Sequence, residues 1–239
     1  MQPSDRRLVE KARAAISSCA LFRGLTPEQR AQLTERVRMR TYVAGDTIFS
    51  MGDPGPSLMA VVEGSVGIGV PSPEGKEIIL AIMHVGDVFG ELGLLDGRER
   101  SADARAMEAC TLAILERRDV LRVFEGCPQA YFEVVLLLCE RIRRTTTQVA
   151  EVTLLDLPSR LARVLLRVAR AQHAGEAVET LEPVKLSQRE LGAIVGATRE
   201  SVNKCLRNWQ RSRIVEVQGS AIRILDLAAL KSLTDHFEP

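Results

Sequence analysis

The most regular pattern of apolar and polar positions lies in residues 128–155. Apolar residues recur there with alternating spacings of four and three, along a seam formed by Tyr131, Val135, Leu138, Ile142, Thr145, Val149 and Val152. This heptad spacing predicts a long helix that pairs in parallel with a second copy of the chain. A helix packed against its own domain is the alternative. A polar residue in a dry seam lowers stability, so Thr145 is expected to have another role.

Before this helix, between residues 42 and 115, short runs of β-branched residues alternate with turn dipeptides such as Gly-Asp and Glu-Gly. Turns spaced by 7 to 12 residues predict a small antiparallel sandwich or barrel. We expect strands at 61–66, 77–82 and 110–115, and a loop at 71–75. The predicted class is therefore α+β, with a β-rich N-terminal part and a helical remainder.

The residues after the long helix predict a separate helical domain. Pro158 disfavours a helix interior but suits a helix start, so we place the domain boundary there. Ser187 and Glu190 form a capping-box pattern, Gly196 predicts a turn, and Thr198 predicts the cap of a second helix. Two helices joined by a Gly-containing turn are typical of a helix-turn-helix, whose second helix enters the DNA major groove.

Two further elements are expected after the helix-turn-helix. Apolar residues alternate on both sides of residues 218–220, which predicts a hairpin or wing, and residues 227–237 have the pattern of a last short helix. Between residues 183 and 213 the chain holds seven Lys or Arg and two Glu, although its total formal charge is only +1. This local excess of positive charge is the electrostatic pattern expected of a DNA-binding surface.

Composition excludes several other classes. The chain has 239 residues, 46% hydrophobic and 26% charged, and no apolar run long enough to span a bilayer. Its charged start does not resemble a secretory signal, so we expect a cytoplasmic protein with no membrane partner. The five cysteines are scattered without a CxxC pair, and the three histidines share no metal-ligand spacing, so no metal is expected.

Residues 90–102 carry the candidate ligand chemistry. This stretch holds three glycines, carboxylates close to arginines, and Ser101 directly after Arg100. Glycines allow the backbone N–H groups to approach an anion, and an Arg offers a planar fork to phosphate oxygens. A Ser hydroxyl can add a hydrogen bond, and a carboxylate can accept one from a ribose hydroxyl. A Gly-rich turn with solvated charges is the alternative.

Three stretches of the sequence resemble the cyclic-AMP receptor protein family of bacterial transcription regulators, which also includes the fumarate-nitrate regulators. Gly90-Glu91-Leu92-Gly93 and Arg98-Glu99-Arg100-Ser101-Ala102 resemble its phosphate-binding cassette, and residues 190–202 resemble its winged helix-turn-helix. The resemblance covers about residues 25–225. It implies a jelly-roll-like β-roll that binds a cyclic nucleotide, a dimerisation helix with a hinge, and a winged helix-turn-helix. The three parts correspond to residues 1–127, 128–156 and 157–239.

The resemblance implies roles for individual residues in the sensor. Arg100 and Ser101 would contact the cyclic phosphate, Glu91 would accept from the ribose 2′-hydroxyl, and Gly90 and Ala102 would contribute backbone contacts. Thr145 matches the residue that contacts the adenine edge. Thr146 falls where cyclic-AMP binders take a Ser from the partner subunit. The implied effector is cyclic AMP.

The resemblance also implies how DNA is read. Arg199 and Glu200 match the pair that contacts base edges, where Arg can bind guanine and Glu can accept from cytosine. Lys204 replaces an Arg of the cyclic-AMP-dependent members, and Asn203 replaces a Gly and adds a possible base contact. Ser187 and Gln188 are expected phosphate contacts.

The expected protein is thus a homodimeric regulator that binds a palindromic double-stranded DNA site under cyclic-AMP control, with RNA polymerase as a further partner. Regulators of the same fold that respond to cyclic GMP, cyclic di-GMP, a redox signal or no ligand remain alternatives. An iron–sulfur sensor needs an N-terminal cysteine cluster, whereas only Cys19 precedes residue 100. An enzyme on a jelly roll would need clustered histidines, and His84 is the only one in the roll, so no enzyme is expected.

Overall fold

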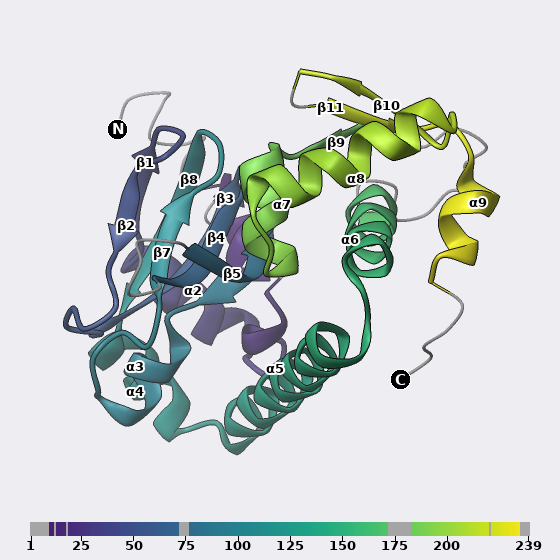
Figure 1. Ribbon diagram of the computed structural model, residues 1–239. Helices are drawn as coiled ribbons and strands as arrows, with labels where there is room; N and C mark the ends of the chain where they lie inside the picture. Colours follow the sequence, from purple (N-terminus) through teal and green to yellow (C-terminus); the bar gives the residue numbers. More distant parts are fainter. Residues whose placement is uncertain are drawn as a thin grey trace. The chain divides into compact units, whose positions relative to one another are not determined.

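The structure is a computed structural model, and it describes residues 10–11, 13–17, 19–71, 77–171, 183–219 and 221–234 (Figure 1). The chain divides into two compact units. One comprises residues 1–75 and 79–142, and the other comprises residues 76–78 and 143–239. Within the described residues, no helix has the length and apolar character needed to cross a membrane.

Two four-stranded sheets form the first unit. One has the strand order β1-β8-β3-β6 and the other β2-β7-β4-β5. The pairings β1–β8, β3–β8, β3–β6, β2–β7 and β4–β7 are antiparallel. The strands are β1 (Arg38–Tyr42), β2 (Thr47–Phe49), β3 (Ser57–Glu63), β4 (Val66–Pro71), β5 (Glu77–Met83), β6 (Val88–Phe89), β7 (Asp103–Ala106) and β8 (Cys110–Glu116). The helices of this unit are η1 (Ala20–Phe22), α2 (Pro27–Glu35), α3 (Glu91–Asp96), α4 (Arg117–Glu125) and the first part of α5 (Pro128–Leu154).

Strand β3 is buried on both faces and separates two parts of the core. Leu58 and Ala60 belong to a cluster with Phe22 and Phe124 of the helices. Met59, the residue between them, belongs to a second cluster, which includes buried residues of β1, β4, β6, β7 and β8. Because successive side chains of a strand point to opposite faces, this division follows directly from the pleat. Helices thus cover one face of the β1-β8-β3-β6 sheet, and the roll's interior lies on the other.

The second unit is helical with a small sheet. After the last part of α5 it contains α6 (Leu157–Ala171), β9 (Val184–Lys185), α7 (Gln188–Val195), α8 (Arg199–Arg211), β10 (Val215–Gln218), β11 (Ala221–Ile224) and α9 (Leu227–Ser232). The strand order is β10-β11-β9. Its helices meet through buried apolar residues: Leu161 and Leu165 of α6, Leu191 of α7, and Val202 and Leu206 of α8.

Most predicted elements are confirmed, with one error. The long helix 128–155 is α5, and the strands expected at 77–82 and 110–115 are β5 and β8. The strand expected at 61–66 is wrong: β3 ends at Glu63 and β4 begins at Val66. Gly64 has a φ of +77° and a Cβ there would overlap the carbonyl oxygen of Ala109, so the chain turns at this glycine between the two strands.

Parts of other predictions fall outside the described residues. This applies to residues 72–75 of the expected loop, to Ser220 in the wing turn, and to residues 235–237 of the expected last helix. The hairpin on either side of residue 220 is confirmed as β10 and β11, and the last helix, α9, ends at Ser232.

Candidate functional site

The predicted phosphate-binding segment forms a short turn around Arg100. Gly90 has a φ of +80° and precedes α3, and Gly97, with a φ of +74°, follows it. A Cβ on Gly90 would overlap Nη1 of Arg100 and would lie 3.1 Å from the carbonyl oxygen of Ser57. Glycine is therefore required at position 90 for two reasons, the left-handed backbone and the close approach of the guanidinium.

Arg100 lies almost entirely inside the protein, with only 5% of its surface exposed. Its Nη1 donates to the carbonyl oxygen of Gly90 at 3.1 Å, and its Nη2 donates to Oγ of Ser57 at 2.9 Å. Its Nε is buried and has no hydrogen-bond partner among the described residues. Burial lowers the pKa of the Arg100 guanidinium, and the charges of Glu91 and Asp53 oppose this shift.

Glu91 is the second buried charge, with 2% of its surface exposed. Its Oε1 accepts from Nη1 of Arg141 on α5, and Nη2 of Arg141 donates to the carbonyl oxygen of Val88. The other carboxylate oxygen, Oε2, is buried without a partner in the described part of the chain. The site therefore holds one carboxylate oxygen that can accept a further hydrogen bond.

The loop between β2 and β3 fixes the backbone at Arg100. The amide of Arg100 donates to the carbonyl oxygen of Asp53 at 2.8 Å, and the amide of Gly52 donates to the carbonyl oxygen of Arg100 at 2.9 Å. A Cβ on Gly55 would lie 3.2 Å from Cα of Gly93, so the backbones of the loop and α3 are in direct contact. Two backbone hydrogen bonds and close packing thus hold the segment in place.

The structure brings most of the predicted ligand residues together. Gly90 contacts the guanidinium of Arg100, Ser101 follows it on the surface, and Ala102 is buried. Thr145 and Thr146 are exposed on the part of α5 that belongs to the second unit. Their contribution to the ligand site stays a prediction.

The predicted helix-turn-helix is confirmed in the second unit. Ser187 caps α7 with the expected capping box, in which its Oγ accepts from the amide of Glu190 at 3.2 Å. Gly196 has a φ of +66° in the turn, and Thr198 caps α8. The Gln188 side chain donates to the carbonyl oxygen of Gly219 at 3.4 Å, which connects the start of α7 to the β10–β11 hairpin.

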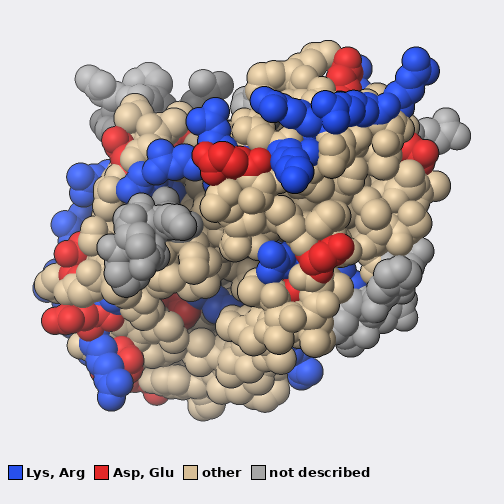
Figure 2. Space-filling model, viewed as in Figure 1, with Lys and Arg blue, Asp and Glu red and all other residues tan. Residues whose placement is uncertain are grey.

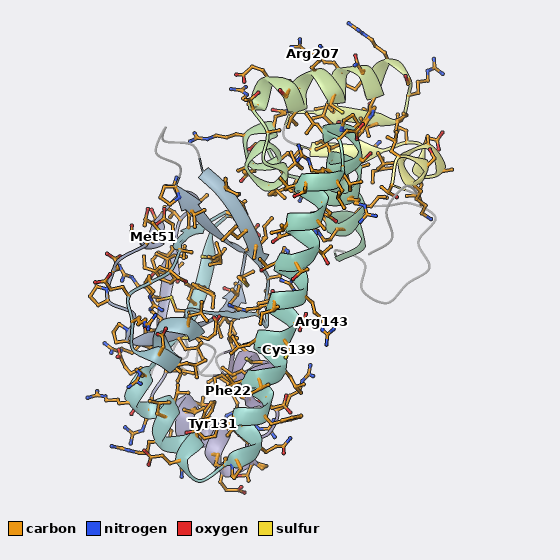
Figure 3. All side chains as sticks on the ribbon, turned by 60° about the horizontal axis from the view of Figure 1, so that its bottom comes forward. Phe22, Met51, Tyr131, Cys139, Arg143 and Arg207 are labelled. Atoms are coloured by element: carbon orange, nitrogen blue, oxygen red, sulfur yellow. The ribbon has the colours of Figure 1, made fainter. Side chains whose placement is uncertain are left out.

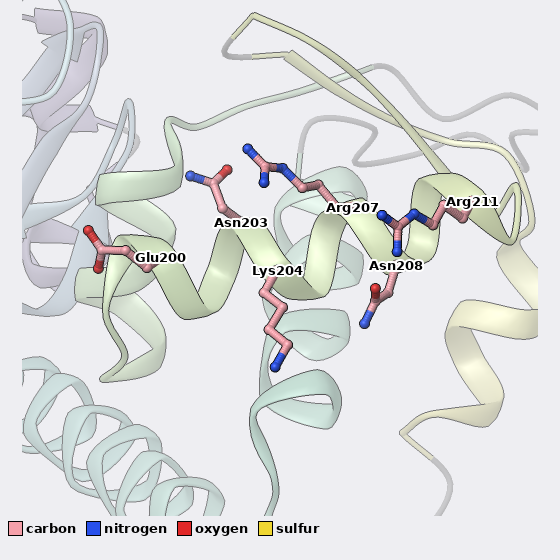
Figure 4. Close-up of a pocket in the computed structure, with 6 residues that line it drawn as sticks. All are labelled: Glu200, Asn203, Lys204, Arg207, Asn208 and Arg211. Carbon is pink, nitrogen blue, oxygen red and sulfur yellow. The ribbon is translucent and has the colours of Figure 1, made fainter.

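The outer face of α8 is polar and mostly cationic. Figure 2 shows Lys and Arg side chains in a row over this helix. A hollow of about 330 Å³ lies between side chains spaced by three or four residues along α8 (Figure 4). It is lined by Glu200, Asn203, Lys204, Arg207, Asn208 and Arg211. Three of these are predicted DNA contacts; Arg199, the fourth predicted contact on α8, is exposed at its first turn.

Several residues of these sites were absent from the sequence prediction. Phe49, Ser57 and Arg141 contact the buried charges from β2, β3 and α5, and no local motif includes them. Arg207 lines the α8 hollow but is not among the predicted contacts. Asn208 and Arg211 extend that face; their spacing from Lys204, four and seven residues, could have identified them.

Both parts of the chain match known families. Residues 39–127 match the model of the cyclic nucleotide-binding domain, and residues 159–233 match that of the Crp-like helix-turn-helix domain. A solved structure of the c-di-GMP responsive global regulator CLP of Xanthomonas campestris is similar in fold. Its TM-score is 0.74 at 22% identity, over 84% of this chain and all of that chain.

Curated relatives agree with the two domain matches. The chain is 29% identical over 211 residues to the CRP-like cAMP-activated global transcriptional regulator of Mycobacterium tuberculosis, covering 88% of this chain and 94% of that protein. It is 30% identical over 182 residues to the cAMP-activated global transcriptional regulator CRP of Escherichia coli, covering 76% and 86%. The chain belongs to the CRP/FNR family of transcription regulators, with a cyclic nucleotide-binding domain followed by a DNA-binding helix-turn-helix domain.

Proposed function

We propose that this regulator acts as a homodimer whose affinity for a palindromic DNA site is controlled by cyclic AMP bound beside Arg100. The observation that carries the proposal is the pair of incompletely bonded, buried groups in the sensor. Arg100 keeps a buried Nε–H without a partner in the described chain, and Glu91 keeps a buried carboxylate oxygen in the same condition. A ligand with an anionic phosphate and a neighbouring hydroxyl would satisfy both groups.

Each predicted contact has a chemical role in this proposal. Arg100 and Ser101 bind the cyclic phosphate, Glu91 accepts from the ribose 2′-hydroxyl, and the backbone at Gly90 and Ala102 lines the phosphate. Thr145 and Thr146 are proposed to contact the purine, one of them from the partner subunit. No group in this set performs bond-breaking chemistry, in line with relatives that are transcriptional regulators.

We propose cyclic AMP as the effector because both curated relatives are named as cAMP-activated. Cyclic di-GMP is the second candidate, because a regulator of similar fold is described as responsive to it. The two unpartnered protein groups need one anion and one hydroxyl donor from a ligand. A single cyclic mononucleotide carries both. Cyclic GMP presents the same two groups, so the purine contacts must distinguish it from cyclic AMP.

The exposed seam of α5 supports the homodimer. Ile142 and Val149 are 66% and 62% exposed, and Val135 and Val152 are exposed as well, which is unfavourable for large apolar side chains in water. Tyr131 is also exposed, near one end of the helix (Figure 3). Their heptad spacing is that of a helix that buries the seam against a second copy.

Arg141 connects the ligand site to the dimer helix. It lies between the seam residues Leu138 and Ile142 and binds the carboxylate that is proposed to receive the ribose hydroxyl. Ligand binding therefore changes the hydrogen bonding of a group that α5 itself holds. We propose that this favours the dimer arrangement in which both α8 helices reach successive major grooves, one DNA turn apart. The proposed setting is the cytoplasm, with RNA polymerase as the further partner.

The proposal is tested by ligand-dependent DNA binding. A fluorescent duplex selected from a random palindromic pool is titrated with the protein, with and without cyclic AMP, and anisotropy is measured at fixed salt. The wild-type protein should bind more tightly with cyclic AMP, whereas Arg100→Ala should show no response to it. An equal response in both proteins would overturn the assignment of Arg100. A response to cyclic di-GMP or cyclic GMP alone would replace the effector.

A further inference from the structure

Arg100 is held from two sides by residues outside the phosphate-binding motif. Cζ of Arg100 lies 4.2 Å from the centroid of the Phe49 ring, and Oγ of Ser57 accepts from its Nη2. We propose that Phe49 and Ser57 are positioning residues that orient the Arg100 guanidinium for the ligand's phosphate. This inference rests on the proposed function, because it assigns how the proposed phosphate contact is prepared.

The Phe49 ring stabilises the buried charge of Arg100. Arg100 is buried, yet among the ion pairs of the described residues none includes it, and the nearby carboxylate of Glu91 is paired with Arg141 instead. A buried cation without a contacting carboxylate is strongly destabilising unless other groups compensate. The negative face of an aromatic ring does so at this distance. Phe49 therefore stabilises the charge while leaving it unneutralised, so that it remains available to an anion.

Phe49 and Ser57 also constrain the orientation of the guanidinium plane. A guanidinium has five N–H donors in one plane, and the contacts to Gly90 and Ser57 use one from each terminal nitrogen. The Phe49 ring covers one face and resists tilting of this plane. The remaining donors, including the unpartnered Nε–H, lie in the same plane, as a two-oxygen contact with a phosphate requires.

The ring itself is also fixed. Phe49 pairs with Ala104 in the β2–β7 ladder, and its centroid lies 5.9 Å from that of Phe89, which is fully buried. Its position is thus set by the sheet and by the roll's core before Arg100 contacts it. This arrangement meets the requirement for precise binding, a functional side chain whose supports are locked by packing.

The test combines ligand titration with an independent observation of Arg100. Cyclic AMP binding is measured by calorimetry on the full-length protein for Phe49→Leu, Phe49→Tyr and Ser57→Ala. Ile114→Ala, in the same core cluster on β8, is the control for lost core packing. We expect Phe49→Leu to weaken binding by about 5- to 30-fold and Ser57→Ala by about tenfold. Phe49→Tyr, which keeps the ring, and Ile114→Ala should bind as the wild type does.

The guanidinium is observed by NMR in protein labelled with ¹⁵N-arginine, and the Arg100 signal is assigned with Arg100→Lys. Because the ring current of Phe49 acts on a group stacked over it, the Arg100 proton signals should shift in Phe49→Leu, and stay in place in Ile114→Ala. The inference is overturned if the Arg100 signals are unchanged in Phe49→Leu. It is also overturned if affinity is unchanged, or if it falls equally in Ile114→Ala.

The calorimetry and the NMR measurement separate the two proposals. A wild-type protein that binds no cyclic nucleotide would contradict the proposed function. The NMR signals alone would then decide the positioning of Arg100: a shift in Phe49→Leu supports it and no shift overturns it.

Discussion

Arg141 of α5 donates to the carboxylate of Glu91, a residue that lies 50 positions earlier in the chain and directly follows Gly90. Glu91 is nearly fully buried, and the side chain of Arg141 is 27% exposed. Arg141 also binds the carbonyl oxygen of Val88, so one guanidinium holds both ends of the turn that begins α3. The segment proposed to bind the ligand and the proposed dimer helix are therefore joined by a charged group.

Removal of Arg141 should destabilise the protein because it leaves a buried carboxylate without its partner. We expect Arg141→Ala to lower the free energy of unfolding in urea by roughly 2–4 kcal/mol, toward the lower end because Arg141 is partly exposed. The double variant Arg141→Ala with Glu91→Gln should regain part of this loss, since the neutral amide is less costly to bury unpaired. Equal stability of the single variant and the wild type would show that the pair contributes nothing.

Gly90→Ala should impair ligand binding beyond its effect on stability. A left-handed non-glycine residue costs about 1–2 kcal/mol, and the new Cβ would also displace the Arg100 guanidinium. Gly45→Ala is the matched control, because Gly45 has a φ of +89° with open space around its Cβ. Calorimetry with cyclic AMP should show unchanged affinity in Gly45→Ala and at least about a tenfold loss in Gly90→Ala. An equal affinity of Gly90→Ala and Gly45→Ala for cyclic AMP would exclude the steric role of position 90.

A charge placed in the α5 seam should dissociate the proposed dimer. Ile142→Glu puts a carboxylate at the centre of the seam, where a second copy would bury it. The molecular mass measured by sedimentation velocity should fall from about twice the chain mass of 26.3 kDa to that of one chain. The neighbouring variant Arg143→Glu, next to the seam and exposed, should remain dimeric. A wild-type protein that sediments as a monomer would contradict the dimer itself.

The polar face of α8 should divide into residues that read bases and residues that bind phosphates. Arg199→Ala should cost about 1–3 kcal/mol on the preferred site and relax the preference at one base pair. Arg211→Ala, two turns beyond Lys204, should weaken binding to all duplexes equally. It should also reduce the slope of the logarithm of the binding constant against the logarithm of the salt concentration by about one. Anisotropy titrations on the selected site and on single-base variants distinguish these effects. Loss of base preference in Arg211→Ala instead would reverse the assignment.

Local signals were enough to predict the helix-turn-helix. The capping box of Ser187 and Glu190, the turn glycine Gly196 and the cap Thr198 each act within a few residues, and the structure contains all of them. The α5 helix was predicted equally well because its apolar spacing persists over many turns. The strand expected at 61–66 failed because it was extended across the turn dipeptide Glu63-Gly64, where the chain passes from β3 into β4.

The residues that support Arg100 and Glu91 in the proposed ligand site could not be predicted in the same way. Phe49, Ser57 and Arg141 lie 43 to 51 positions from the charges they contact, and their pairing depends on sheet register and on where α5 packs. Phe49 in the sequence is one apolar strand residue among several. Only the fold shows that its ring lies against Arg100.

Isothermal titration of the purified protein tests whether buried Arg100 is an anion contact for a cyclic nucleotide. Cyclic AMP, cyclic GMP and cyclic di-GMP are titrated separately into the wild type and into Arg100→Ala. We expect one cyclic AMP per chain with micromolar affinity, and no measurable binding in the variant. Equal affinity of the two proteins for cyclic AMP, or no binding of any of the three nucleotides to the wild type, would rule out this role of Arg100.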